Sequence, residues 1–232
     1  MSFSTSHSPT HAQTITPNFF SQTMLYFGLA LAAAAGGVFA GMYFLPPTLL
    51  ASTGFMLLMF AITLILVFTA RKWSRSNFGY LFLILFAGIF GLTLVPLLAY
   101  AAAVAGAGII GKALLSAVAM FGGMAVFGFT TNRDLSGLGG FLMAGLIGMI
   151  CVSLITFVLH LFGVSVWSNT MELIFSGFGV LIFAGFTMYD FQKIKHSEGQ
   201  ITPIEAAIKI FLDFILLFQY ILRFMIGMSG RD

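Results

Sequence analysis

Long apolar runs with almost no charge constrain this chain more than any other feature of its sequence. The first 70 residues contain no Lys, Arg, Asp or Glu, and the chain of 232 residues is 59% hydrophobic and 7% charged. A typical soluble domain carries roughly 25% charged residues. A transmembrane β-barrel would show segments of about ten residues with alternating polarity, whereas the apolar runs here are continuous. The sequence therefore predicts an all-α integral membrane protein.

Seven segments are long enough to cross a bilayer, which takes about 20 apolar residues. They follow a polar segment, residues 1–21, which is rich in Ser and Thr and is expected to be a flexible tail. The tail lacks the basic start of a secretory signal, so no cleavage is expected. The transmembrane domain is predicted to occupy residues 22–232. Its expected spans are Thr23–Phe44, Thr48–Ala70, Gly79–Tyr100, Ile110–Thr130, Leu138–Phe162, Met171–Phe191 and Pro203–Gly227.

The connectors between these spans differ in charge, and the difference predicts the orientation of the chain. Cytoplasmic loops of membrane proteins carry an excess of Lys and Arg. With the N-terminus inside, the outer side holds only Lys112 and Arg231, apart from basic residues within the last span. The cytoplasmic segments then hold Arg71, Lys72, Arg75, Arg133, Lys193 and Lys195. We therefore expect a cytoplasmic N-terminus and a C-terminus on the opposite side.

The last expected span is unusually polar for a membrane helix. It opens with Thr202-Pro203-Ile204-Glu205, in which Thr caps the helix, Pro takes its first position and Glu its third, as in a capping box. Acidic and basic residues then recur at every fourth position, so they are expected to share one face. A helix with lipid on all sides would not carry such groups, and we expect this helix to be central, with its polar face toward an interior cavity. The residues of this stripe are Glu205, Lys209, Asp213 and Tyr220, with Gln219 and Arg223 at its flanks.

Two aspartates lie where a carboxylate is costly. Asp190 closes one apolar segment and Asp213 lies inside the next, and the short connector between them sends the chain back antiparallel. The two carboxylates are therefore expected to meet at similar depth, near the cytoplasmic side. Charged groups inside a membrane are usually retained for ion, proton or substrate handling. Two carboxylates that lie close together in a low dielectric cannot easily both ionise, so they are expected to titrate as a unit.

A nearby cation would turn such a pair into a switch. Arg71, at the cytoplasmic end of the second span, is the best-placed candidate, and Lys72 and Arg75 remain open. With both carboxylates ionised, Arg71 would bind one of them and clamp the helices. On protonation the acids would share a hydrogen bond, and a path would open. The pair Asp190 and Asp213 would also attract Ca2+, which prefers oxygen ligands. The alternative is a static ion pair that only fixes helix packing.

Three motifs resemble those of a known family. Residues 130–139, TTNRDLSGLG, are similar to its T-T-K-R-D-L-S-G-x-G connector, and residues 185–194, GFTMYDFQKI, are similar to G-x-x-x-Y-D-x-Q-x-I. Residues 212–218, LDFILLF, are similar to L-D-F-I-N-L-F, and Leu222-Arg223 follow at the right distance. On these residues the chain resembles the bacterial branch of the transmembrane Bax inhibitor motif family, over nearly everything after the N-terminal tail.

This resemblance implies a seven-helix bundle with the last helix at its centre and a pH-sensitive Ca2+ leak. It assigns the sensor to Asp190 and Asp213, with Arg71 as the most plausible basic partner. Ca2+ is then the transported ion, and no cofactor is expected. Besides the lipid bilayer, Ca2+ and protons, the resemblance suggests as partners the membrane protease to which some bacterial members are linked. Eukaryotic members are linked to suppression of cell death. The short loops and bacterial motifs suggest a bacterial inner membrane.

The chain departs from the family pattern at several positions. Leu216 replaces the usual Asn of the last motif, Phe191 replaces a small or polar residue, and Asn132 stands where a basic residue is common. The span Thr48–Ala70 has no carboxylate, which some members carry there. Fewer acidic groups are then available for an outer Ca2+ site, while the sensor pair is unaffected.

Other classes of function fit the sequence less well. An intramembrane aspartyl protease needs G-x-G-D at its second aspartate, but Asp213 follows Ile210-Phe211-Leu212, so no enzyme is expected. A nucleic-acid partner is not expected either, because no basic stripe with interleaved aromatic residues is present. The remaining alternative is a non-conducting modulator of a protease or of a stress or cell-death pathway, for which the tail 1–21 is the one candidate recognition surface.

Overall fold

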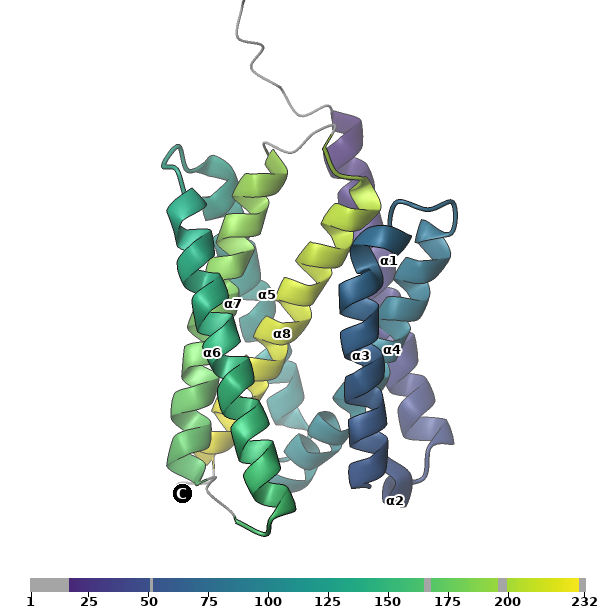
Figure 1. Cartoon of the computed structure of the whole chain (residues 1–232), viewed down its shortest axis with the longest axis vertical. Helices are drawn as coiled ribbons and strands as arrows, with labels where there is room; N and C mark the ends of the chain where they lie inside the picture. The colour runs from purple at the N-terminus through teal and green to yellow at the C-terminus, as the bar shows by residue number, and fades with distance from the viewer. Residues whose placement is uncertain (1–16, 51, 165–167, 196–199, 230–232) are drawn as a thin grey trace, which may run out of the picture.

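The computed structural model describes residues 17–50, 52–164, 168–195 and 200–229. Within these ranges all regular secondary structure is helical, and seven helices are long and apolar enough to cross a membrane (Figure 1). The prediction of an all-α membrane protein with seven spans is thus confirmed. The helices are α1 (Pro17–Phe44), α2 (Pro47–Leu50), α3 (Thr53–Trp73), α4 (Gly79–Ala105), α5 (Gly108–Thr130), α6 (Ser136–Leu161), α7 (Asn169–Lys195) and α8 (Pro203–Ser229).

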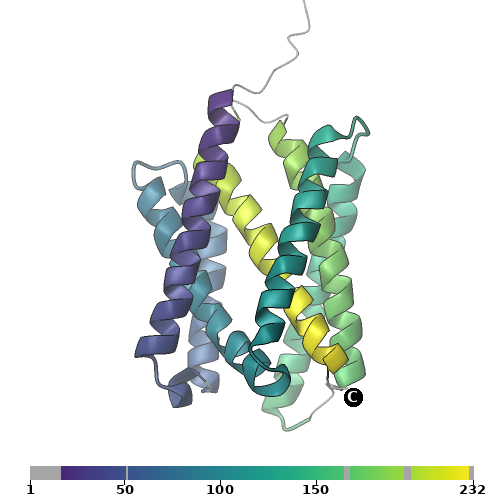
Figure 2. The same ribbon diagram turned by 180° about the vertical axis from the view of Figure 1, so that it is seen from behind.

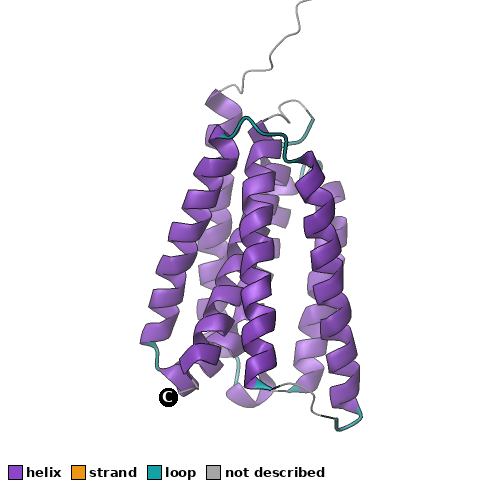
Figure 3. Ribbon diagram, turned by 90° about the vertical axis from the view of Figure 1, so that its left-hand side faces the viewer, coloured by secondary structure: helices purple, strands orange, loops and turns teal. Residues whose placement is uncertain are grey.

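Successive long helices run in opposite directions and are joined mostly by short connections (Figure 3). The start of α1 lies at the same end of the bundle as the α3–α4, α5–α6 and α7–α8 connections, and α8 finishes at the other end (Figure 1). We call the end of the bundle where α1 starts the basic end. The described basic residues in or next to its connections are Arg71, Lys72, Arg75, Arg133, Lys193 and Lys195.

Helix α8 crosses the middle of the bundle diagonally, as the views from both sides show (Figures 1 and 2). It packs against α1, α4, α5 and α7, and its apolar residues, Ile210, Leu217 and Leu222 among them, are fully buried. The last helix is therefore central, as predicted. Two polar residues of α8, Glu205 and Asp213, are consequently buried inside the bundle.

Helices α3 and α6 lie at the rim of the bundle. Helix α6 packs mainly on α7, and α3 packs mainly on α4 with a smaller contact to α8. Their outward side chains are large and apolar, such as Phe68 on α3 and Ile155 on α6, and are the surface that lipid would cover. Cys151 on α6 is a free, exposed cysteine, in keeping with a chain that has one cysteine.

Small residues let α1 and α4 approach closely. A Cβ atom added at Gly37 would collide with the backbone carbonyl oxygen of Gly88, and one at Gly91 would collide with the carbonyl oxygen of Ala34. Such contacts allow helices in lipid to gain dispersion energy over a long interface. Gly37 of α1 and Gly91 of α4 thus serve packing within the chain.

Two predicted boundaries are wrong. The expected span Thr48–Ala70 is broken into α2 and α3, because the Ser52 hydroxyl accepts a hydrogen bond of 3.2 Å from the N–H of Phe55 and starts a new helix at Thr53. At the N-terminus, α1 begins at Pro17, so residues 17–21 are helical rather than part of the tail. Residues 1–16 of the predicted tail lie outside the described residues.

Candidate functional site

The first two family-like motifs bind each other at the basic end. The side chain of Gln192, in residues 185–194, accepts a hydrogen bond of 3.0 Å from the N–H of Leu135 and donates one of 2.6 Å to the carbonyl oxygen of Arg133. Both of these partners lie in residues 130–139. A single amide side chain thus joins the α5–α6 connector to the last turns of α7.

Close backbone packing fixes α7 further. A Cβ atom at Gly128 would collide with the carbonyl oxygen of Met188, and one at Gly139 would overlap the ring of Tyr189. Helix α7 is therefore in tight contact with both α5 and α6 beside Asp190. These glycines lie in or next to the first motif, and they hold one aspartate of the predicted sensor in a defined place.

The connector itself is ordered by a polar turn. The N–H of Ser136, the first residue of α6, donates to Asp134 Oδ1 at 2.9 Å. Hydrogen bonding from Ser136 to the exposed Asp134 carboxylate lowers its pKa below the ordinary value of 3.8. Just before the connector, the carbonyl oxygen of Phe129 in the last turn of α5 accepts a hydrogen bond of 3.0 Å from Nζ of Lys195, the last residue of α7.

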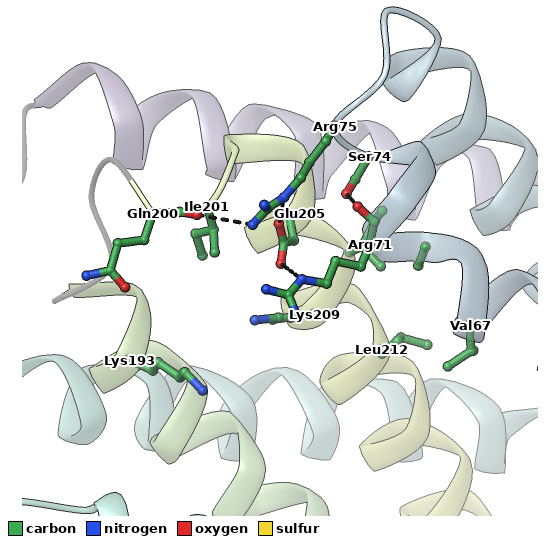
Figure 4. A pocket seen from close by; sticks show the side chains of 12 residues that line it. Val67, Arg71, Ser74, Arg75, Lys193, Gln200, Ile201, Glu205, Lys209 and Leu212 are labelled. Atoms are coloured by element: carbon green, nitrogen blue, oxygen red, sulfur yellow. Dashed lines mark hydrogen bonds and ion pairs between the residues drawn. The ribbon is translucent and has the colours of Figure 1, made fainter.

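The start of α8 follows the prediction in one half of the capping box. The hydroxyl of Thr202 accepts a hydrogen bond of 3.1 Å from the N–H of Glu205, and Pro203 is the first helical residue. The other half is absent, because the Glu205 carboxylate points toward α3 instead of back to Thr202 (Figure 4). The helix start was predictable from local sequence, whereas the partner of Glu205 was not.

Two arginines surround the Glu205 carboxylate, Arg71 in the last turn of α3 and Arg75 just after its end. Arg75 Nε donates to Oε2 at 3.0 Å, and Arg71 Nε lies 4.0 Å from Oε1. Arg75 also donates from Nη2 to the carbonyl oxygen of Gln200 at 3.1 Å. Arg75, one of the alternatives to Arg71, therefore makes the shorter contact, and in this arrangement both arginines are directed to Glu205.

The polar stripe of α8 does not face a single cavity. Glu205 faces α3, whereas the ring of Tyr220 stacks on Phe183 of α7 with ring centroids 5.4 Å apart. A spacing of four residues exceeds one helical turn by about 40°, so the direction rotates by about 80° between Glu205 and Asp213. The stripe therefore begins against α3 and turns toward α7.

Asp213 and Asp190 lie within electrostatic range of each other. Lys209 acts on both carboxyl groups, and Lys193 acts on Asp190 as well. Asp213 is only 6% exposed, and its Oδ2 atom is buried and has no hydrogen-bond partner among the described residues. Within the described part of the chain, no group of three or more His, Cys, Asp or Glu side chains is placed to hold a metal ion.

A cavity of about 440 Å3 opens beside these residues at the basic end (Figure 4). Asp190 and Asp213 are not among the residues that line it. Its lining comes from α3, α8 and the residues that flank the α7–α8 connection. The charged residues of this lining are Arg71, Arg75, Lys193, Glu205 and Lys209, and the apolar ones are Val67, Ala70, Ile201, Ile208 and Leu212.

A second cavity, of about 840 Å3, lies toward the opposite end, between α3, α4, α7 and α8. An ion pair lies in this cavity: Arg223 Nη1 is 3.7 Å from Glu172 Oε1, in the first turn of α7. The hydroxyl of Thr63 is buried at the same cavity and has no hydrogen-bond partner among the described residues. Leu216 reaches this cavity, as Leu212 reaches the other.

The sequence was compared with known proteins. The sequence model described as inhibitor of apoptosis-promoting Bax1 matches residues 16–231. The chain belongs to the Bax inhibitor family. It is 34% identical to the inner membrane protein YbhL of Escherichia coli over 181 residues, which are 73% of this chain and 72% of the relative. A Campylobacter jejuni protein is 30% identical over 216 residues (92% and 90%), and a Rickettsia prowazekii protein is 31% identical over 188 residues (76% and 75%).

Membership of the Bax inhibitor family confirms the resemblance that was based on the three motifs. The part of Gln192 in joining two of those motifs was not foreseen, although the residue stands within the quoted pattern. An amide inside a conspicuous polar motif at a helix end is the signal that could have indicated it. The pairing of Glu172 with Arg223 was not predicted either, although Glu172 begins one apolar span and Arg223 lies near the end of the next, antiparallel one.

Proposed function

We propose that this member of the Bax inhibitor family is a pH-sensitive Ca2+ leak, with Asp190 and Asp213 as its proton sensor. The observation that carries the proposal is the buried Asp213 carboxyl group: one of its oxygens has no hydrogen-bond partner within the described part of the chain, and a second carboxylate lies nearby. A membrane bundle does not gain stability from an unsatisfied buried carboxyl group. Its retention is explained by a function in ion or proton handling.

The switch would use Arg71 as the exchanging cation. When the two acids are ionised, Arg71 binds one of them and clamps α3 to the centre of the bundle. When they take up protons, the acids share a hydrogen bond and the clamp is released. Arg71 lies 4.0 Å from Glu205 in the present arrangement, so the exchange moves it between Glu205 and the aspartates. Lys209, which acts on both aspartates, stands next to this route.

The donor set suits an ion in passage better than a resident one. Two carboxylates supply at most four oxygens, and Ca2+ takes about six to eight ligands in a stable site. The two cavities reach α8 one turn apart, at Leu212 and at Leu216. A path through the protein would need to open across that one turn. The proposal includes no enzymatic step and no cofactor.

The proposed location is a bacterial inner membrane with the N-terminus in the cytoplasm. The relative in Escherichia coli is an inner membrane protein. The six basic residues of the basic end, which is also the end where α1 starts, support this orientation under the positive-inside rule.

The test is Ca2+ flux in liposomes that contain the purified protein and no partner. Wild type is expected to show a flux that changes between about pH 6 and pH 8, and Asp190→Asn and Asp213→Asn are each expected to flatten that change. Asp134→Asn is the matched control, because it neutralises an exposed carboxylate that lines neither cavity. If both aspartate variants keep the wild-type pH profile of Ca2+ flux, Asp190 and Asp213 are not the proton sensor. Absence of flux in wild type would favour a non-conducting modulator.

A further inference from the structure

The cavity at the basic end has an unusual charge for a space inside a membrane bundle. Four cationic side chains and one carboxylate line it, together with the polar residues Ser74 and Gln200. Figure 4 shows Glu205 between the two arginines, with Lys209 on the next turn of α8. Clustered cations repel one another and are costly near hydrocarbon unless anions offset them. Among the described residues of this lining, one carboxylate faces four cations.

Some of this cationic hydrogen-bonding capacity is unused. Arg75 is engaged with Glu205 and Gln200, but the contact of Arg71 with Glu205 is 4.0 Å long and its side chain is 78% exposed. Among the described residues, neither the Arg71 guanidinium nor the Lys209 ammonium makes a hydrogen bond. A guanidinium presents five N–H donors in a planar fork, and an ammonium presents three. The cavity therefore offers more donors than the protein itself uses.

The carboxylates nearby do not cancel this surplus. Asp190 and Asp213 are not part of the lining; both act electrostatically on Lys209, and Asp190 also acts on Lys193. Among the described ion pairs, Arg71 on α3 has only its 4.0 Å contact with Glu205. It is thus the cation of the lining that is most available to an incoming anion.

The deeper wall of the cavity is apolar. Val67 precedes Arg71 by one turn on α3, and Leu212 follows Lys209 by about one turn on α8, so both lie further into the bundle than the charged groups. A ligand that places an anionic group on the cations could thus lay an apolar part on Val67 and Leu212. The lining thus changes from charged to apolar with depth, as a phospholipid changes from its headgroup to its acyl chains.

We propose that this cavity binds an anionic phosphate group, one whose negative charge is not offset by a cation in the same molecule. Phosphate oxygens match the fork of Arg71 and the point charge of Lys209, and charge-assisted hydrogen bonds of this kind are the strong ones. The phosphate could belong to an anionic phospholipid or to a soluble phosphate. Binding needs no Ca2+ conduction and is measured without flux, so its failure and failure of the leak are separate results.

The experiment titrates the purified full-length protein in detergent with phosphatidylglycerol and follows lipid adducts by native mass spectrometry. Phosphatidylcholine with the same chains is the neutral comparison, and inorganic phosphate is added as a competitor. We expect phosphatidylglycerol to bind at least tenfold more tightly than phosphatidylcholine. Displacement by millimolar phosphate would assign the site to the phosphate group alone, and resistance to it would assign the site to the lipid.

Arg71→Gln and Lys209→Gln are each expected to weaken phosphatidylglycerol binding by about tenfold, the effect of losing a hydrogen bond to a charged group. Arg133→Gln is the matched control, because it removes one charge from the same end outside the cavity. Arg71→Lys keeps the charge and should recover part of the affinity, which shows that a weakened variant is folded. Equal affinity in wild type and in both Gln variants, or equal affinity for the two lipids, would overturn the proposal.

Discussion

Arg75 and Glu205 are 130 residues apart in the sequence and joined by a hydrogen bond of 3.0 Å between Nε and Oε2. The bond connects the residues just after the end of α3 to the first turn of α8, the central helix. Glu205 is buried, so its charge depends on this partner. Breaking one side of a buried pair leaves an uncompensated charge, which costs more than the pair contributes.

We therefore expect Glu205→Gln and Arg75→Gln each to lower the free energy of unfolding by about 1–2 kcal/mol, because the charge pair is only partly screened by the 43% exposure of the Arg75 side chain. Arg71→Gln should cost less, since its contact is longer and more exposed. Thermal unfolding in detergent measures all three. A double variant of Arg75 and Glu205 that costs the sum of the single variants would show that the two residues do not interact.

The close approach of α1 and α4 predicts a contrast between adjacent glycines. Gly37→Ala should destabilise the fold by about 1–3 kcal/mol, because its Cβ would collide with the Gly88 carbonyl oxygen and the helices would have to separate. Gly36→Ala has open space around the new Cβ and should be neutral or slightly stabilising, since Ala favours the helix. Thermal unfolding of the two variants side by side tests this. Equal changes in stability would mean that the α1–α4 interface can accommodate a side chain at Gly37.

The turn at Asp134 should weaken in acid. Its pKa is lowered in the folded protein by hydrogen bonds from Ser136, so this carboxylate stabilises the fold above the ordinary value of 3.8, and the contribution is lost as pH falls through the lower folded value. The amide signal of Ser136 in an NMR titration should shift with a midpoint below 3.8. Asp134→Asn keeps an acceptor oxygen and should abolish the shift. A midpoint above 3.8 in wild type would contradict the hydrogen bond.

The architecture could be predicted because it depends on local composition. Runs of apolar residues gave the seven spans, Thr202 and Pro203 marked the start of the last helix, and its polar residues indicated a central position. The proximity of Asp190 and Asp213 followed from a short antiparallel connection. These inferences need only the period of a helix and the thickness of a bilayer.

The partners of the charged residues could not be predicted in the same way. Whether Glu205 binds Arg75, Arg71 or its own helix depends on the rotation and height of α3 relative to α8, which many distant contacts decide together. The break at Ser52 was missed for the opposite reason: one local hydrogen bond ended an apolar run that composition alone made continuous. The rotation of the α8 stripe was missed because a four-residue spacing only approximates a helical turn.

The close glycine contact between α5 and α7 suggests how a change in the distance between Asp190 and Asp213 could be measured. Backbone lies close to backbone where Gly128 meets Met188, so we expect α5 and α7 to move as one unit that carries Asp190. A change in the separation of the two acids is then expected to come from displacement of α8. A spin label on the lipid-facing Leu181 of α7 would give a fixed origin, and distances from it to α8 would record that displacement directly.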